Sequence, residues 1–233
     1  MHAHVMIQRA AEILFFTLLA AGIPLISWLP MRDPQIWTLP RRSLYASAAL
    51  SEWIFVLLGL VAVKLAGVQL HEVGLRDVAM PAFTFWTLVL AAASAAGLGL
   101  LLLLEQRGLW PDEPERVYLL IPRTPAEKAW ALLIVAPTAA LAEEFLYRGY
   151  LLTVIARALH SVGWAWALSS VAFGLAHLYQ RPSGMIRAAA LGALLGWPVV
   201  RTGSLYPSIA AHFLIDAAAF GWLGPRMLKS EAM

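Results

Sequence analysis

Two adjacent glutamates and an arginine lie at the end of an apolar stretch of the chain. Glu143, Glu144 and Arg148 follow the apolar run 130–141. An ionisable side chain inside hydrocarbon costs at least ~2.5–3.5 kcal/mol on insertion scales, so ionisable residues in membrane spans are expected to be functional. Glu144 and Arg148 are four residues apart with the glutamate first, which is the favourable order for an ion pair on a helix.

The first glutamate of the pair faces another direction. Glu143 is rotated by about 100° from Glu144, because a helix has 3.6 residues per turn. It has no local cation, and a carboxylate of this kind in a low-dielectric setting is suited to activate water as a general base. We therefore predict one glutamate held structurally by Arg148 and one that is free for chemistry.

Two later apolar runs also carry polar side chains that can take part in catalysis. His212 and Asp216 are four residues apart on one helix face, so the aspartate can hold the imidazole in one tautomer and leave the other nitrogen for a substrate oxygen. His177 ends another apolar run, next to Gly174 and Ala176, which are small enough to admit a neighbouring helix. A base, two imidazoles and a carboxyl group suffice for peptide hydrolysis without a nucleophilic side chain.

The composition indicates that a membrane-embedded helical bundle carries these residues. The chain is 61% hydrophobic and 13% charged, whereas soluble domains average about 45–50% and about 25%. We predict an all-α, polytopic bundle of about seven (six to eight) transmembrane helices. It would form one integral membrane domain, 1–233, with N-terminal spans in 1–124 and a catalytic core in 125–223. The predicted spans are 11–29, 44–66, 82–104, 125–159, 162–178, 185–200 and 204–223.

Local signals refine this arrangement. The sequence TPAE at 124–127 predicts a capped helix start with proline in the first turn. Small residues at four-residue spacing, Ala188, Gly192 and Gly196, predict a helix that packs closely against a neighbour. Residues 180–184 are predicted to form a turn.

The amino-acid composition and net charge limit the cofactors and partners that the chain can have. The chain has no cysteine, which excludes disulfides, a thiol nucleophile and thiolate metal sites. Its net charge of +3 is explained by basic loop residues that set orientation and meet anionic lipid, so we predict a bilayer and no nucleic acid as partner. The compact, cysteine-free chain favours a prokaryotic inner (plasma) membrane. Glu52, inside the second span, is interpreted as structural.

Three ordered motifs resemble those of a known family of membrane proteases. The motifs are EExxxR at 143–148, FxxxH at 173–177 and HxxxN/D at 212–216. In this order, on successive hydrophobic segments, they resemble the CPBP family, the CAAX proteases and bacteriocin-processing enzymes. This family is also called ABI and is related to the type II CAAX prenyl endopeptidase. The resemblance covers about 125–220, and residues 73–76 are similar to a short segment often seen ahead of the domain.

The resemblance implies an intramembrane glutamate protease. It implies that Glu143 activates water with help from His177, and that Glu144 and Arg148 form the supporting pair. Phe173 belongs to the same support. The expected reaction is hydrolysis of a peptide bond in or near the membrane, in a protein or peptide substrate that is membrane-anchored, prenylated or carries a sorting signal.

The resemblance also assigns the last motif to the oxyanion site. His212 and Asp216 would line it, where the prenyl endopeptidases resembled most carry asparagine at the second position. An ionised aspartate cannot donate a hydrogen bond to an oxyanion. Asp216 therefore acts either in its protonated form or through His212.

Three other functions compete with this interpretation. Two histidines and glutamates are legitimate zinc ligands, but the chain has no HExxH and Glu144 is engaged by Arg148; we predict no cofactor, with zinc as the open alternative. A proton-coupled transporter would spread its ionisable groups along a path, whereas here they cluster in one half. A non-catalytic scaffold or immunity-type protein of the same fold would bind a partner's transmembrane segment.

Overall fold

The computed structural model describes residues 2–111 and 115–224, and these residues form helices and loops without strands. This confirms the predicted all-helical class. Seven longer helical segments make up most of the described part of the chain. Five of them are long and apolar enough to cross a membrane, namely 8–32, 41–65, 80–106, 125–159 and 178–202. The other two are a shorter apolar helix, Val162–Ala176, and the segment 206–223.

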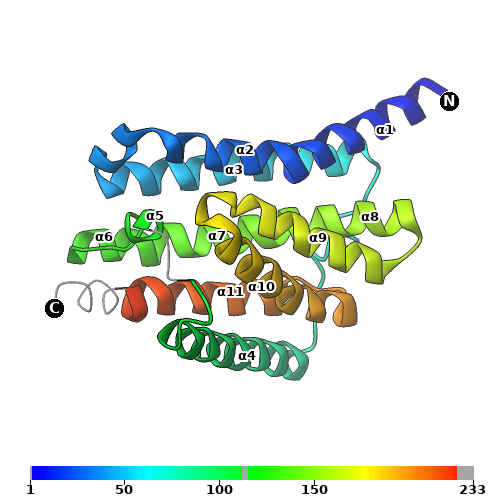
Figure 1. Cartoon of the computed structure of the whole chain (residues 1–233). Coiled ribbons are helices and arrows are strands. Elements are labelled where there is room, and N and C mark those ends of the chain that lie inside the picture. Colours follow the sequence, from blue (N-terminus) through cyan, green and yellow to red (C-terminus); the bar gives the residue numbers. More distant parts are fainter. Residues whose placement is uncertain (1, 112–114, 225–233) are drawn as a thin grey trace.

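The helices form layers, and the helices of the C-terminal half lie between those of the N-terminal half (Figure 1). Helices α1 to α3 line one side, α4 lies at the opposite edge, and α6 to α11 fill the space between them. The α-helices are α1 (His2–Thr17), α2 (Ile23–Trp28), α3 (Arg41–Leu65), α4 (Met80–Gln106), α5 (Glu115–Tyr118), α6 (Pro125–Trp130), α7 (Ala136–Glu143), α8 (Leu152–Leu159), α9 (Val162–Ala176), α10 (Arg181–Thr202) and α11 (Tyr206–Ala218). Shorter 3-10 and π-helical segments join or extend them at Leu18–Gly22 (η1), Pro30–Arg32 (η2), Pro34–Thr38 (η3), Ala131–Val135 (η4), Glu144–Leu151 (η5), Leu178–Gln180 (η6) and Ala219–Leu223 (η7).

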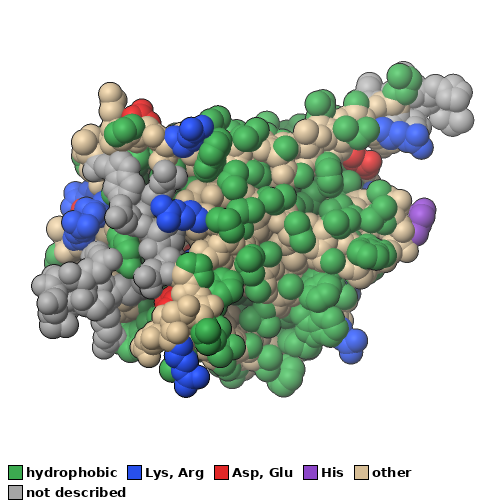
Figure 2. Space-filling model, viewed as in Figure 1, with side chains coloured by type: hydrophobic (Ala, Val, Ile, Leu, Met, Phe, Trp, Pro, Cys, Tyr) green, Lys and Arg blue, Asp and Glu red, His purple; other side chains and the backbone are tan. Residues whose placement is uncertain are grey.

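The surface is apolar over the middle of the helices. Figure 2 shows hydrophobic side chains across the central part of this face, with the charged side chains toward the ends of the helices. Large apolar residues are widely exposed, including Leu133 (73%), Trp164 (67%) and Leu57 (61%). Soluble monomers rarely expose contiguous apolar patches of this extent. The chain is therefore an integral membrane protein.

The helix from Pro125 to Leu159 carries the glutamate pair. Its start is a capping box, because Thr124 Oγ1 accepts a hydrogen bond from the Glu127 N–H (3.2 Å) and Glu127 Oε2 accepts one from the Thr124 N–H (3.0 Å). The predicted helix start is thus confirmed. Two π-helical stretches, η4 and η5, interrupt the α-helix, and η5 begins at Glu144. Such irregular turns inside helices often occur at functional sites.

Small residues let α9 and α10 approach closely, which confirms the predicted packing helix. A Cβ on Gly174 would lie 2.7 Å from the Met185 carbonyl oxygen, and one on Gly196 would lie 2.9 Å from Trp166 Cδ1. Trp166 Nε1 donates a hydrogen bond to the carbonyl of Ala193 (2.8 Å), which fixes the two helices to each other. The predicted turn at 180–184 is wrong, because α10 already begins at Arg181.

We expect Gly174→Ala to destabilise the protein by about 1–3 kcal/mol, because the added methyl group overpacks a close helix contact. Gly99→Ala is the matched control, since the same methyl group on α4 meets nothing within 4 Å. It should leave the melting temperature unchanged or raise it, because alanine is the better helix former. Thermal unfolding of both variants in the same detergent tests this expectation, and equal melting temperatures would contradict it.

The loop between α3 and α4 is fastened to the helices that follow it. Gly74 has a φ of +81°, in the left-handed region that glycine tolerates, and its carbonyl accepts a hydrogen bond from the Leu205 N–H (2.9 Å). A Cβ on Gly149 would lie 2.8 Å from the Val73 carbonyl oxygen. The segment Val73–Arg76 is thus packed against both the helix with the glutamate pair and the start of α11.

An exposed ion pair also ties this loop to α8. Arg157 Nη2 donates to both carboxylate oxygens of Glu72 at 2.9 Å, and Thr153 Oγ1 donates to the Glu72 carbonyl (3.0 Å). The Gln69 N–H, which donates to the Glu72 carboxylate, and Arg157 together hold the pKa of Glu72 below its usual value. The pair is therefore ionised near neutral pH, but because it is exposed it is worth only about 0–1 kcal/mol.

Candidate active site

Three helical segments bring the predicted site residues to one place. Glu143 ends α7 and Glu144 begins η5, while His177 directly follows α9. His212 and Asp216 both lie on α11, which packs against α7. The carboxylates of Glu143, Glu144 and Asp216 gather around the imidazole of His212, and the ring of Phe173 lies between His212 and His177.

Glu144 is fully buried and has two partners. Its Oε1 lies 3.2 Å from Arg148 Nη1, so the predicted i, i+4 pair is present. The same oxygen accepts a hydrogen bond from His212 Nδ1 (2.8 Å). Glu144 therefore joins its own helix to α11 and fixes the orientation of the His212 ring.

Arg148 is almost completely buried and is held from several sides. Its Nε donates a hydrogen bond to the Gly192 carbonyl (3.4 Å), and its guanidinium carbon lies 3.9 Å from the centre of the Phe173 ring, a cation–π contact. A Cβ on Gly192 would lie 3.1 Å from Arg148 Nη2, so a larger residue there would press against the guanidinium. The contact with Glu144 is an ion pair without hydrogen-bond alignment, and among the described residues neither Nη atom makes a hydrogen bond.

The second nitrogen of His212 faces two carboxylates. Its Nε2 lies 3.7 Å from Glu143 Oε2 and 3.7 Å from Asp216 Oδ2. We expected Asp216 to hold the imidazole in one tautomer, but in the structure Glu144 takes Nδ1 and Asp216 faces Nε2. Both Glu143 (22% exposed side chain) and Asp216 (24%) keep some exposure, whereas Glu144 has none.

His177 reaches the cluster through Phe173. The Phe173 carbonyl can only accept, so His177 Nδ1 donates the 2.9 Å hydrogen bond between them and Nε2 keeps its lone pair. The ring of Phe173 packs edge-on against His177, with 4.7 Å between ring centres, and lies 6.4 Å from the ring of His212. Phe173 thus positions two imidazoles and one guanidinium together.

One further carboxyl group lies near the cluster and was not among the predicted site residues. Glu52 on α3 interacts electrostatically with Glu143, His212 and Asp216. Its buried Oε2 has no hydrogen-bond partner in the described part of the chain. The sequence signal was an acidic residue on the buried face of an apolar helix, which we had interpreted as structural.

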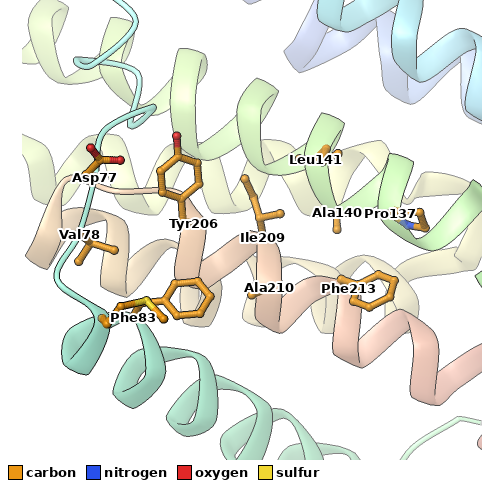
Figure 3. A pocket seen from close by; sticks show the side chains of 11 residues that line it. Asp77, Val78, Phe83, Pro137, Ala140, Leu141, Tyr206, Ile209, Ala210 and Phe213 are labelled. Atoms are coloured by element: carbon orange, nitrogen blue, oxygen red, sulfur yellow. The ribbon is translucent and has the colours of Figure 1, made fainter. Parts of the chain in front are cut away.

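An apolar groove of about 590 Å³ opens beside the site. Figure 3 shows Pro137, Ala140 and Leu141 of α7 on one wall, with Ile209 and Phe213 of α11 opposite and Phe83 of α4 at the edge. The groove therefore runs between the two helices that carry the glutamate pair and His212. Its lining is suited to hydrocarbon more than to a polar ligand.

Metal binding is the alternative that the histidines and glutamates leave open. Within residues 2–111 and 115–224, no group of three histidine, aspartate or glutamate side chains is placed to hold one metal ion.

Fold and site together define a membrane-embedded helical protein with a cluster of glutamate, histidine and arginine inside the bundle. Residues 125–218 match the family model described as "Type II CAAX prenyl endopeptidase Rce1-like". These residues are a domain of that family, which confirms the resemblance, and membership implies an intramembrane protease that acts on a protein substrate. No curated protein and no solved structure matches the chain.

Proposed function

We propose that this chain is an intramembrane endopeptidase in which Glu143 activates a water molecule to hydrolyse a peptide bond. The substrate is a membrane-anchored protein or peptide, prenylated near its cleavage site, and the membrane is a prokaryotic plasma membrane. One observation supports the different roles of Glu143 and Glu144 more than any other. Glu144 is fully buried and engaged by Arg148 and His212, whereas Glu143 stays partly exposed and faces His212 Nε2.

The proposed reaction needs one water molecule and no covalent intermediate. Glu143 accepts a proton from water while the hydroxyl oxygen adds to the peptide carbonyl carbon, and the Nε2 of His177 assists this step as a second acceptor. With both ring nitrogens protonated, His212 keeps Nδ1–H on Glu144 and offers Nε2–H to the oxyanion. The C–N bond then breaks as Glu143 returns its proton to the leaving amine.

The other polar residues position these groups. Arg148 neutralises Glu144, so that the buried glutamate can hold the imidazole without an uncompensated charge. Asp216 lies 3.7 Å from His212 Nε2, where its charge favours the imidazolium form. In this scheme Asp216 acts through His212 and does not contact the oxyanion.

The groove between α4, α7 and α11 supports a substrate with an apolar anchor. Ala140 and Leu141 line it just ahead of Glu143, and Phe213 lines it just after His212. An anchor that already lies in the bilayer would pass from lipid into this groove without exposing its CH₂ or isoprenoid units to water, and van der Waals packing against the apolar lining would hold it. An anchor held there would bring the adjoining peptide close to Glu143.

The direct test uses the purified full chain in lipid nanodiscs with a farnesylated CAAX peptide, in heavy-oxygen water. We expect release of the C-terminal tripeptide, with one heavy oxygen atom in the new carboxylate of the prenylated fragment. The same peptide without its farnesyl group should be cleaved far more slowly. If neither peptide is cleaved, the prenylated-substrate proposal fails, and if membrane-anchored peptides also stay intact, a non-catalytic scaffold is the better description.

Chelation should leave this activity unchanged. The scheme uses carboxylates, imidazoles and water alone, so dialysis against a strong zinc chelator is expected to preserve the cleavage rate. The rate is measured on the farnesylated peptide before and after dialysis, with a known zinc protease as positive control for the chelator. Activity lost on chelation and restored by Zn²⁺ would replace this scheme with a metal-dependent one.

A further inference from the structure

The short turn between α9 and α10 carries a tyrosine close to His177. Leu178–Gln180 form the 3-10 segment η6, and Tyr179 is its middle residue. The ring of Tyr179 stacks on the imidazole of His177, with 27° between the ring planes and 6.0 Å between the ring centres. Offset stacks at such separations are favourable for aromatic pairs. His177 therefore contacts the ring of Tyr179 as well as that of Phe173.

The stack adds to the contacts that fix the imidazole. Nδ1 of His177 donates to the Phe173 carbonyl (2.9 Å), and the Phe173 ring packs edge-on at 4.7 Å. The last torsion of a histidine side chain is broad, so one hydrogen bond and one edge contact still let the ring plane rock. A roughly parallel neighbour opposes that motion. The ring of Tyr179 thus helps to keep Nε2 of His177 pointing in one direction.

The tyrosine is itself held in place by the residues that follow it. Gln180 Nε2 donates a hydrogen bond to the Tyr179 hydroxyl (2.9 Å). A Cβ on Gly184 of α10 would lie 2.8 Å from Gln180 Oε1, so a larger residue there would press against the glutamine. The first turn of α10 therefore supports Gln180, and Gln180 supports the tyrosine.

The backbone of the turn is fastened without the help of the Tyr179 ring. Ser27 Oγ on α2 donates to the Ala176 carbonyl (2.8 Å), and the Gln180 N–H donates to the His177 carbonyl (2.8 Å). Arg181 then has a φ of +65° and a ψ of 176°, a region that essentially only glycine adopts. Such strained residues persist where the surrounding structure fixes them, and they cluster at active sites. A tyrosine that only anchors a helix at the membrane surface does not account for this strained turn.

We propose that Tyr179 is a positioning residue of the active site, whose ring holds the imidazole of His177 with Nε2 directed at the attacking water. This inference rests on the proposed function, in which Nε2 of His177 is the second proton acceptor. Tyr179 acts through His177 and does not touch the substrate. The ring carries this role, and the hydroxyl serves to hold the ring through Gln180.

The test that does not depend on catalysis is the tautomer of His177. Isotope-labelled histidine is followed by NMR in the full chain in nanodiscs, at a pH where the ring is neutral, with the His177 signals identified by their loss in His177→Gln. In the wild type, Nδ1 should give the signal of a protonated nitrogen and Nε2 that of an unprotonated one. In Tyr179→Leu the two signals should move toward each other, because a rocking ring leaves the Phe173 carbonyl part of the time and exchanges tautomers. Unchanged signals in this variant would overturn the proposal.

Cleavage of the farnesylated peptide gives the second measurement. Tyr179→Leu should lower kcat about 10²-fold, the loss that a misplacement of about 1 Å can cause. KM should stay nearly unchanged, because the ring does not contact the substrate. Tyr179→Phe keeps the ring and should keep both kcat and the His177 signals close to the wild type. A kcat as low in Tyr179→Phe as in Tyr179→Leu would contradict a role for the ring.

Trp164→Leu is the matched control for these experiments. It removes an aromatic ring that is 67% exposed on α9, and it should change neither kcat nor the His177 signals. The melting temperatures of all variants are measured in the same nanodiscs. A loss of kcat at the wild-type melting temperature supports positioning, whereas a raised KM with unchanged kcat would overturn it.

A second variant covers the case in which Tyr179→Leu does not fold. Tyr179→Met then takes its place, because a flexible methionine can fill the same space without a ring. If the wild type cleaves no peptide but the His177 signals still respond to the loss of the Tyr179 ring, the proposed function fails and the placement of Tyr179 on His177 stands.

Discussion

Replacing Glu143 with glutamine is expected to lower the cleavage rate about 10²–10⁴-fold, the range that a general base contributes. Glutamine keeps the size of the side chain but cannot accept the proton of the attacking water. Glu143 is partly exposed and makes no ion pair with Arg148, so the variant should fold normally. The rate constant on the farnesylated peptide is the measurement, together with the melting temperature of the same preparation.

Glu12→Gln is the matched control for this substitution. It removes the same charge from α1, outside the site, and should retain the wild-type rate. If Glu143→Gln cleaves the peptide at the wild-type rate, Glu143 is not the general base. A lower rate accompanied by a clearly lower melting temperature would instead assign Glu143 to the structure of the bundle.

Replacing Arg148 with alanine should cost both stability and activity. The substitution leaves the carboxylate of Glu144, which has no exposure, with His212 as its one remaining partner among the described residues, and breaking a buried ion pair costs about 3–5 kcal/mol. It also removes the guanidinium from the Phe173 ring and from the Gly192 carbonyl. We expect a lower yield of folded protein, a lower melting temperature and loss of cleavage.

Arg157→Ala supplies the comparison for that experiment. Arg157 pairs with Glu72 at 2.9 Å, but the two side chains are 41% and 36% exposed, and exposed pairs contribute only about 0–1 kcal/mol. Both substitutions remove one arginine from an ion pair, so a difference in melting temperature between them reports the effect of burial and not of the lost charge alone. Equal melting temperatures for the two variants would contradict a structural role for the Glu144–Arg148 pair.

The elements of the fold were predictable because their signals are local. Long apolar runs define the helices, and the Thr124 capping box fixes the start of the longest one. The turn predicted at 180–184 failed for an equally local reason: proline is as typical of the first turn of a helix as of a loop turn, and Pro182 lies in the first turn of α10. The π-helical geometry of Glu144–Leu151 (η5) was not predicted, because the sequence carries no periodic signal for it.

The sequence motifs indicated which residues to consider for the candidate site, but not which of them contact one another. Spacing along one helix predicts the Glu144–Arg148 contact. The bond from His212 to Glu144 joins residues 68 positions apart, so no helical period indicates it. Asp216 satisfies the i, i+4 rule equally well, which is why it was expected to orient the imidazole. Glu52 lies outside the three motifs, and only the packing of α3 on α7 brings it near them.

The attachment of Val73–Arg76 has a consequence for biogenesis. Ser204 Oγ donates a hydrogen bond to the Arg76 carbonyl (2.8 Å) across 128 positions of sequence, so this contact must wait until the end of α10 has been synthesised. Contacts so distant in sequence form late, because the loop between them must first close. His212 follows Ser204 by only a few residues. A nascent chain therefore attaches the segment Val73–Arg76 and completes its cluster of ionisable groups almost at the same time. Until then the carboxylates already in the membrane have no imidazole from α11, and a partly made chain lacks a complete candidate site.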